Sequence, residues 1–291
     1  AREAVKPIVR TYKAGETIYV NHRVNQAGEE IFYATDHVRT QALLWLALLF
    51  IIAVVAVGRG AGLRALLVLV ATFAIIMKFI IPYIIAGSDP VVIAIIGSLG
   101  ILALAIFGTE GFNRQSLVAF VSVILALGLI LILSKLFTGF AHLSGLESEE
   151  AAYLLSLGNL RINLQGLLLS GIIIGALGVL DDIIISQVSL VKELSKTNPE
   201  MKSAAMFKTA MHVGTDHINA IVNTLFLAYA GVSLPLLVLF TIYNSPEITT
   251  SSIINRELFA TEIVRTLVGS IALVLSVPIA TYLAVKTFCK K

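Results

Sequence analysis

The sequence predicts an all-α polytopic membrane protein with about seven transmembrane helices, preceded by a short N-terminal extracytoplasmic segment of β character. Of its 291 residues, 57% are hydrophobic and only 13% are charged, whereas soluble domains carry about 25% charged residues. The mean hydropathy is +0.92. The apolar residues also come in blocks of the roughly 20 residues that a helix needs to cross about 30 Å of hydrocarbon. The expected partner is therefore a lipid bilayer, and a net charge of +3 gives no reason to expect nucleic acid.

Residues 1–40 have a different composition from the rest of the chain. The stretches "GETIYVNHRV" and "EEIFYATDHVRT" alternate β-forming residues with charges, and the turn signal "NQAG" separates them, which predicts a β-hairpin. This segment is too short to hold its own core. We expect it to be a truncated extracytoplasmic segment, followed by a transmembrane helical domain at 41–291. A cleaved signal, a trimmed terminus and a removed first helix are open alternatives for what preceded it.

The apolar blocks after residue 40 predict the membrane-spanning helices, and two polar connections separate some of them. The outer connection, "HLSGLESEEAAYLLS", is expected to contain a short amphipathic helix. The inner one, 187–217, is expected to form two short helices joined at Pro199. The expected spans are about 42–58, 62–81, 91–109, 116–137, 164–186, 218–243 and 264–286.

Lysine and arginine in the short connections predict the orientation, because cytoplasmic loops carry an excess of both. With the N-terminal segment outside, most of these residues fall on the inner side, and the C-terminus is cytoplasmic. The inner residues are Arg59, Arg64, Arg114, Lys192, Lys196, Lys202, Lys208, Lys286, Lys290 and Lys291.

Two adjacent carboxylates, Asp181 and Asp182, follow a glycine-rich stretch in "GALGVLDDIIISQ". At about 100° per residue, Asp182 shares one helix face with three glycines that we expect to serve helix packing: Gly171, Gly175 and Gly178. One interpretation is that the acids only mark the inner end of a span. However, "IIIS" continues the apolar run beyond them, and ionisable groups inside a membrane usually face a partner, an ion or water.

The sixth predicted span carries a second polar feature, in "MHVGTDHINAIVNTLFLAYAG". His212, Asp216, Asn219 and Asn223 form one stripe along the helix. Each of these side chains needs a hydrogen-bond partner in an apolar surrounding. The stripe is either a buried network that holds helices together or one wall of a solvated site, with Asp181 or Asp182 on the opposite wall.

At these residues the sequence resembles the YibE/F family of bacterial multi-pass membrane proteins. The resemblance lies in "GALGVLDDIIISQVSLVKEL", "HVGTDHINAIVNTLFLAYAGVSLP" and "YATDHVRTQ". It implies an extracytoplasmic N-terminal region behind an anchor helix, a bacterial plasma membrane and a role as a permease or exporter. His217 matches a motif position although it points away from the stripe, and a broken helix near Gly214 is one way to resolve this conflict. All the matching positions are Gly178, Asp181, Asp182, Gln187, Asp216, His217, Asn223 and Thr224.

Three functions remain in competition. The first is an ion- or proton-coupled transporter with a polar intramembrane site between 164–186 and 212–243, carrying a small solute or ion. The second is a membrane scaffold or receptor that does not transport. The third is an intramembrane aspartate-dependent enzyme, which we disfavour because "GVLDD" lacks the glycine that directly precedes the acid in a GxGD signature.

No cofactor is expected apart from a bound cation or proton. The chain has no Walker A sequence, and its single cysteine, Cys289, excludes a cluster of thiolate ligands. Whether a metal binds stays open, since Asp and His are suitable ligands but form no dense cluster in the sequence. A homo-oligomer or a partner subunit is the remaining expectation, because GxxxG favours close helix contact without saying which chain supplies the other helix.

Overall fold

The computed structural model describes residues 12–24, 28, 30–157, 162–243 and 250–289. The described residues form two compact units, 1–63 and 64–291, which divide inside the first long helix. The first unit holds the predicted hairpin. Its strands β1 (Ile18–Val24) and β2 (Glu30–His37) pair antiparallel, with Ile18 opposite His37 and Val24 opposite Glu30. The hairpin prediction is therefore confirmed, although 25–27 of its turn lie outside the described residues.

Helix α1 (Thr40–Ile75) contains the predicted span 42–58 and most of the predicted span 62–81. It continues through a π-helical turn, η1 (Ile76–Ile80), into α2 (Ile81–Ile85), so that the apolar run from Thr40 to Ile85 is 46 residues long. This is about twice the length that one crossing requires. The helix is broken at Arg59, whose backbone angles (φ 50°, ψ −129°) are not helical. Near this break Gly62 is required, because a Cβ atom there would lie 2.3 Å from the carbonyl oxygen of Val54.

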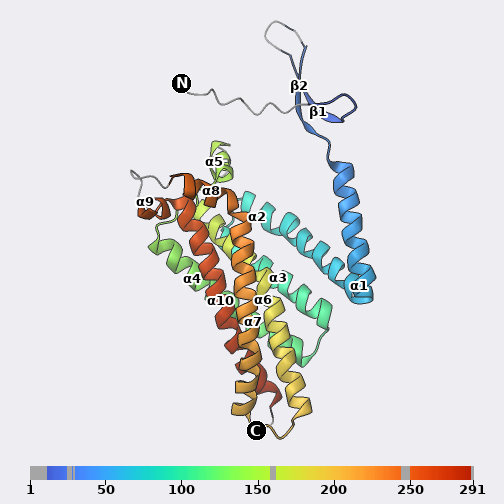
Figure 1. Cartoon of the computed structure of the whole chain (residues 1–291), viewed down its shortest axis with the longest axis vertical. Coiled ribbons are helices and arrows are strands. Elements are labelled where there is room, and N and C mark those ends of the chain that lie inside the picture. The colour runs from blue at the N-terminus through green and yellow to red at the C-terminus, as the bar shows by residue number, and fades with distance from the viewer. Residues whose placement is uncertain (1–11, 25–27, 29, 158–161, 244–249, 290–291) are drawn as a thin grey trace. The chain divides into compact units, whose positions relative to one another are not determined.

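The second unit is a helical bundle built on α4, α6 and α10 (Figure 1). These three helices pack against one another, α7 lies against α10 and α6, and α3 lies against α6. Large aliphatic side chains such as Ile130, Ile173 and Leu273 are almost fully buried between them. The bounds are α3 (Pro90–Glu110), α4 (Arg114–Phe140), α6 (Leu164–Thr197), α7 (Ser203–Val232) and α10 (Glu257–Phe288); the short helices are α5 (Glu149–Ser156), α8 (Leu234–Tyr243) and α9 (Thr250–Ile254).

Among the described residues, five helical runs are long and apolar enough to cross a membrane. They include all of the predicted spans except 218–243. This last segment is not one straight helix: α7 ends at Val232 and α8 leaves it at an angle of 68°. The bend precedes Pro235, which has no N–H to continue the helical ladder and whose ring obstructs the preceding turn. If the bent pair counts as one span, the number of runs rises to six.

The polar connections show one confirmed prediction and one error. The outer amphipathic helix exists as α5, which begins where the Ser148 side chain accepts a hydrogen bond from the backbone N–H of Ala151. The inner connection does not form two separate short helices. Instead α6 continues to Thr197, the chain turns around Pro199, and α7 begins at Ser203. Both halves are extensions of the long helices.

Contacts between connections group them at the two ends of the bundle. At one end the Gln115 side chain donates to Ser189 (2.6 Å) and accepts from Lys192 (2.7 Å), while the Cys289 thiol reaches the carbonyl oxygen of Met201. At the other end Glu257 contacts the chain after α4. The lysine-bearing connections that the orientation rule assigns to one side thus lie at one end of the bundle. Which compartment this end faces stays a prediction.

Candidate functional site

Asp181 lies in the span α6 and faces a cavity of about 290 Å³. Apolar side chains of α3, among them Ile101 and Leu102, line this cavity together with one face of the segment from Ala65 to Ile76 and the α6 residues Ile174, Leu177 and Gly178. The Oδ1 oxygen of Asp181 is shielded from solvent and has no hydrogen-bond partner in the described part of the chain. An unpaired carboxylate is costly in such a place. A proton, a cation or a water molecule beside this oxygen would satisfy it.

Asp182 occupies the neighbouring position on α6 but points to the exposed face of the helix. The predicted face of Gly171, Gly175, Gly178 and Asp182 is real, and all four residues are exposed. A Cβ atom at Gly171 or Gly178 would meet nothing within 4 Å, and one at Gly175 would only reach the Tyr229 hydroxyl at 3.8 Å. No other described residue thus packs closely on Gly171 or Gly178, and their role in helix packing stays a prediction.

The polar stripe on α7 also exists, and it points away from the bundle. The residues of α7 that are buried against the other helices are Met206, Ala210, Gly214 and Leu225. At 100° per residue the stripe lies on the opposite side of the helix, and its four members are all exposed: His212, Asp216, Asn219 and Asn223. The structure therefore does not bring the stripe and the Asp181 cavity together, since no α7 residue lines that cavity.

The N-terminal half of α7 is held instead by a buried amide, that of Gln187 in α6. The Gln187 Nε2 atom donates to the carbonyl oxygen of Ala210 (2.9 Å) and to the Thr281 hydroxyl (2.7 Å), which joins α6, α7 and α10. Gly214 allows this approach, because a Cβ atom there would lie 2.7 Å from Val277 Cγ1 and 3.0 Å from Gln187 Nε2.

The break near Gly214 that was one way to resolve the conflict at His217 is not present: α7 is continuous from Ser203 to Val232, and Gly214 lies where it crosses close to α6 and α10. Gln187 matched the family motif, but the pattern of residues gave it no role. The only feature of the sequence that could have indicated a role for Gln187 was its position on the face of α6 opposite the glycines.

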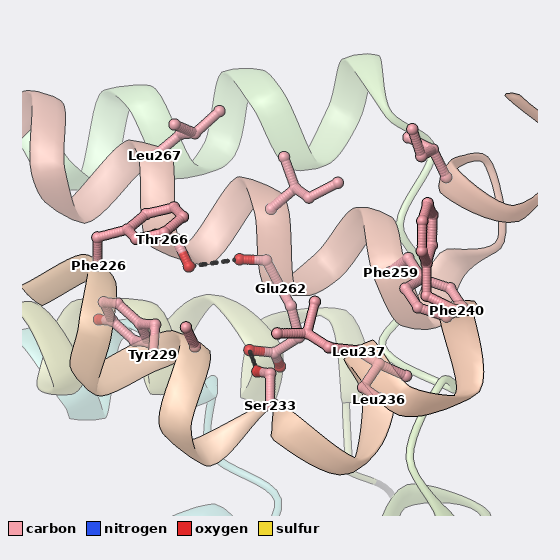
Figure 2. A pocket seen from close by; sticks show the side chains of 13 residues that line it. Phe226, Tyr229, Ser233, Leu236, Leu237, Phe240, Phe259, Glu262, Thr266 and Leu267 are labelled. Carbon is pink, nitrogen blue, oxygen red and sulfur yellow. Dashed lines mark hydrogen bonds between the residues drawn. The ribbon is translucent and has the colours of Figure 1, made fainter. Parts of the chain in front are cut away.

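A larger cavity, of about 390 Å³, lies at the bend between α7 and α8 (Figure 2). Its wall is mainly aromatic and aliphatic, with the hydroxyl groups of Ser233 and Thr266 and one charged side chain, Glu262 of α10. The Ser233 hydroxyl donates to Glu262 Oε2 (3.2 Å), and Arg265 pairs with Glu262 Oε1 (2.6 Å). Glu262 and Arg265 are three residues apart on α10 and form an ion pair along the helix. Because the acid is already paired, this cavity suits an apolar group better than an ion.

Near this cavity, the Glu257 carboxylate holds the connection between α4 and α5. Glu257 accepts hydrogen bonds from the backbone N–H groups of Ser144 and Gly145 and from the Ser144 hydroxyl (2.8 Å). Burial raises the pKa of the nearby Glu147, and the charge of Glu257 adds to this increase. No group of three or more His, Cys, Asp or Glu side chains that could hold a metal ion occurs among the described residues.

The long apolar helices, with many large apolar side chains exposed on their surfaces, are those of a multi-pass α-helical membrane protein. Over residues 46–290 the chain matches the family model described as "YibE/F-like protein". It therefore belongs to the YibE/F-like family. No curated protein and no solved structure matches the chain.

Proposed function

We propose that this protein is a proton- or cation-coupled membrane permease, and that Asp181 binds the coupling ion. The observation that carries the proposal is the unpartnered Oδ1 oxygen of Asp181 at a cavity inside a membrane span. In transporters, intramembrane carboxylates of this kind commonly mark ion or proton paths. Asp182, one residue further on and exposed on the glycine face, gives the same helix turn a second acid on a different side.

The ion has a short route between these two acids in the proposed mechanism. A proton or cation that enters along the exposed face of α6 meets Asp182 and passes to Asp181 at the cavity. The glycines of this face favour movement of α6 against a neighbour, because they present no side chains that would resist sliding. The plasma membrane, with the lysine-rich end of the bundle in the cytoplasm, is the location that this proposal assumes.

Proton flux into liposomes tests the proposal. The purified chain is reconstituted with a trapped pH-sensitive dye, and acidification is followed under a membrane potential with Na⁺, K⁺ or Mg²⁺ outside. We expect Asp181→Asn to reduce the flux to the level of protein-free liposomes and Asp182→Asn to reduce it in part. Ser186→Ala, an exposed change one turn further along α6, is the matched control and should retain full flux.

The result for Asp216→Asn separates two sites. If the four residues of the α7 stripe line the same path, this variant also loses flux; if the path follows α6 alone, it retains flux. Unchanged flux in folded Asp181→Asn protein would overturn the proposal. It would favour a scaffold or receptor, a role for which the exposed α7 stripe is the supporting observation.

The enzyme alternative receives no support from the geometry. An aspartate dyad needs two carboxyl groups that face each other, and Asp216 of α7 is exposed and does not line the Asp181 cavity. Asp181 and Asp182 are neighbours on one helix, about 100° apart, and lie on different sides of it.

A further inference from the structure

The exposed stripe of α7 is the strongest feature that the proposed ion site does not use. Its two amides, one imidazole and one carboxylate extend over about 17 Å of helix, at 1.5 Å per residue. None of the four side chains makes a hydrogen bond or ion pair with another described residue. Asn219 and Asn223 lie inside the predicted span 218–243, where lipid tails offer no partner for an amide and each polar group left unpaired costs several kcal/mol. Something other than lipid must therefore cover this face of α7.

The spacing of the stripe indicates another helix. The residues follow one another at intervals of four, three and four, which is the 3.5-residue repeat of the a and d positions in a left-handed helix pair. The same repeat continues in both directions along α7. The full row is Ala205, Thr209, His212, Asp216, Asn219, Asn223, Phe226 and Ala230, exposed except for the half-buried Ala230.

The chemistry of the stripe makes it complementary to itself. Asparagine amides both donate and accept hydrogen bonds, so Asn219 and Asn223 of one helix can bond to those of an identical helix. The Asp216 carboxylate only accepts, and His212 one turn away supplies a donor, with the cation of Lys208 a further turn along. Copies of one chain insert into a membrane in the same direction. A two-fold axis along the membrane normal therefore places each residue of the α7 stripe beside the same residue of the other copy.

We propose that two copies of this chain pair through α7, in parallel, with Asp216, Asn219 and Asn223 in the centre of the contact. Hydrogen bonds between asparagines of the two copies fix the register, as a single buried asparagine does in soluble helix pairs. Asp216 faces the same residue of the other copy, and His212 and Asn219 of that copy, one position along the stripe on either side, supply the donors that offset the repulsion between the two carboxylates. The proposal names a partner for the stripe, and it holds whether or not Asp181 carries an ion.

Cysteine cross-linking in the native membrane tests the pairing, because the chain has only one cysteine to remove. In a Cys289→Ser background, Asn223→Cys and Asn219→Cys are oxidised with copper phenanthroline and analysed on non-reducing gels. Both should give a disulfide-linked dimer in several times the yield of Thr224→Cys. Thr224 is the matched control, because it is exposed at the same depth as Asn223 but lies about 100° around the helix.

Three results would overturn the proposal. The first is equal or no cross-linking at the three positions. The second concerns membranes that contain both the Asn223→Cys and the Gly175→Cys variants: a higher yield of the disulfide between these two variants than of the disulfide between two Asn223→Cys chains. That result would place α7 against α6 of the other copy. The third is a linked product of another mass, which would identify a different partner. The flux assay is independent of all three, so the pairing and the ion site can fail separately.

Discussion

Single carboxyl groups at the α4–α5 end of the bundle differ in how well they are satisfied. Glu257 has backbone and side-chain donors, whereas the Oε2 oxygen of Glu147 is buried without a hydrogen-bond partner in the described residues. Burial, followed by repulsion from Glu257, raises the pKa of Glu147 above its ordinary value, which is about 4.3. Holding Glu147 in its charged form thus costs the folded state free energy.

We expect this cost to appear as a pH dependence of stability. A raised folded-state pKa of an acid favours folding while the group is protonated, and the benefit is lost as the pH rises through the folded-state pKa. Glu147→Gln, which stays neutral, should therefore unfold at a higher temperature than the parent near pH 7 and at the same temperature near pH 4. Glu150→Gln removes an exposed charge nearby and is the control. A difference in unfolding temperature between Glu147→Gln and the parent that does not change with pH would contradict the expectation.

Spacing along the chain was enough to predict which polar residues share a helix face, and the stripe and the glycine face both exist. It did not predict the direction in which these faces point. In a soluble helix the apolar side marks the core, but a membrane helix is apolar toward lipid and toward its neighbours alike. The sequence could therefore not show that Asp181 faces a cavity in the bundle whereas the stripe of Asp216 faces outward.

At the scale of helices, the crossing of α7 over α6 and α10 depends on the absence of a side chain at Gly214. Gly214→Ala gains the usual helix propensity of alanine, about 1 kcal/mol, and forces Val277 and Gln187 to move, at a cost of about 1–3 kcal/mol. Gly231 lies on the same helix, and no atom is within 4 Å of a Cβ added there. Gly231→Ala therefore gains helix propensity without a steric cost.

The comparison of these two variants measures the crossing. Gly214→Ala should be less stable than Gly231→Ala by about 1–3 kcal/mol in denaturant or thermal unfolding of the detergent-solubilised protein. Combining Gly214→Ala with Gln187→Ala, which removes one of the two obstructing side chains, should reduce the penalty of the glycine change. Equal stability of Gly214→Ala and Gly231→Ala would show that the crossing adapts without cost.

Helix ends were predicted less well than helix centres, and the reasons are local. Hydropathy marks where a helix leaves the hydrocarbon, not where its hydrogen bonds stop, so α6 was expected to end near residue 186 although it continues to Thr197. Conversely, the bend before Pro235 could not be predicted from the apolar run at 218–243, because the side chains on both sides of the bend are equally apolar.

At the scale of the whole molecule, the orientation in the membrane is the prediction with the widest consequence. Gln115 with Ser189 and Cys289 with Met201 place the lysine-rich connections at one end, which the positive-inside rule assigns to the cytoplasm. Leu146, exposed beside the Glu257 contact, marks the opposite end.

Labelling with a membrane-impermeant maleimide tests this orientation. Cys289 of the parent chain should react in inside-out vesicles and not in intact cells. Leu146→Cys in a Cys289→Ser background should react in intact cells. The reverse pattern would invert the orientation, and labelling of both from the same side would contradict the arrangement of the two ends of the bundle.

The long helical hairpin of α6 and α7 has a practical consequence. From residue 186 to the end of α6 at Thr197 the helix extends about 17 Å further, and α7 returns beside it from Ser203. A protein of 31.2 kDa in a detergent micelle is small for the alignment of particle images in electron cryomicroscopy. A rigid protein fused across the turn at Pro199, in register with both helices, would supply a fiducial outside the micelle.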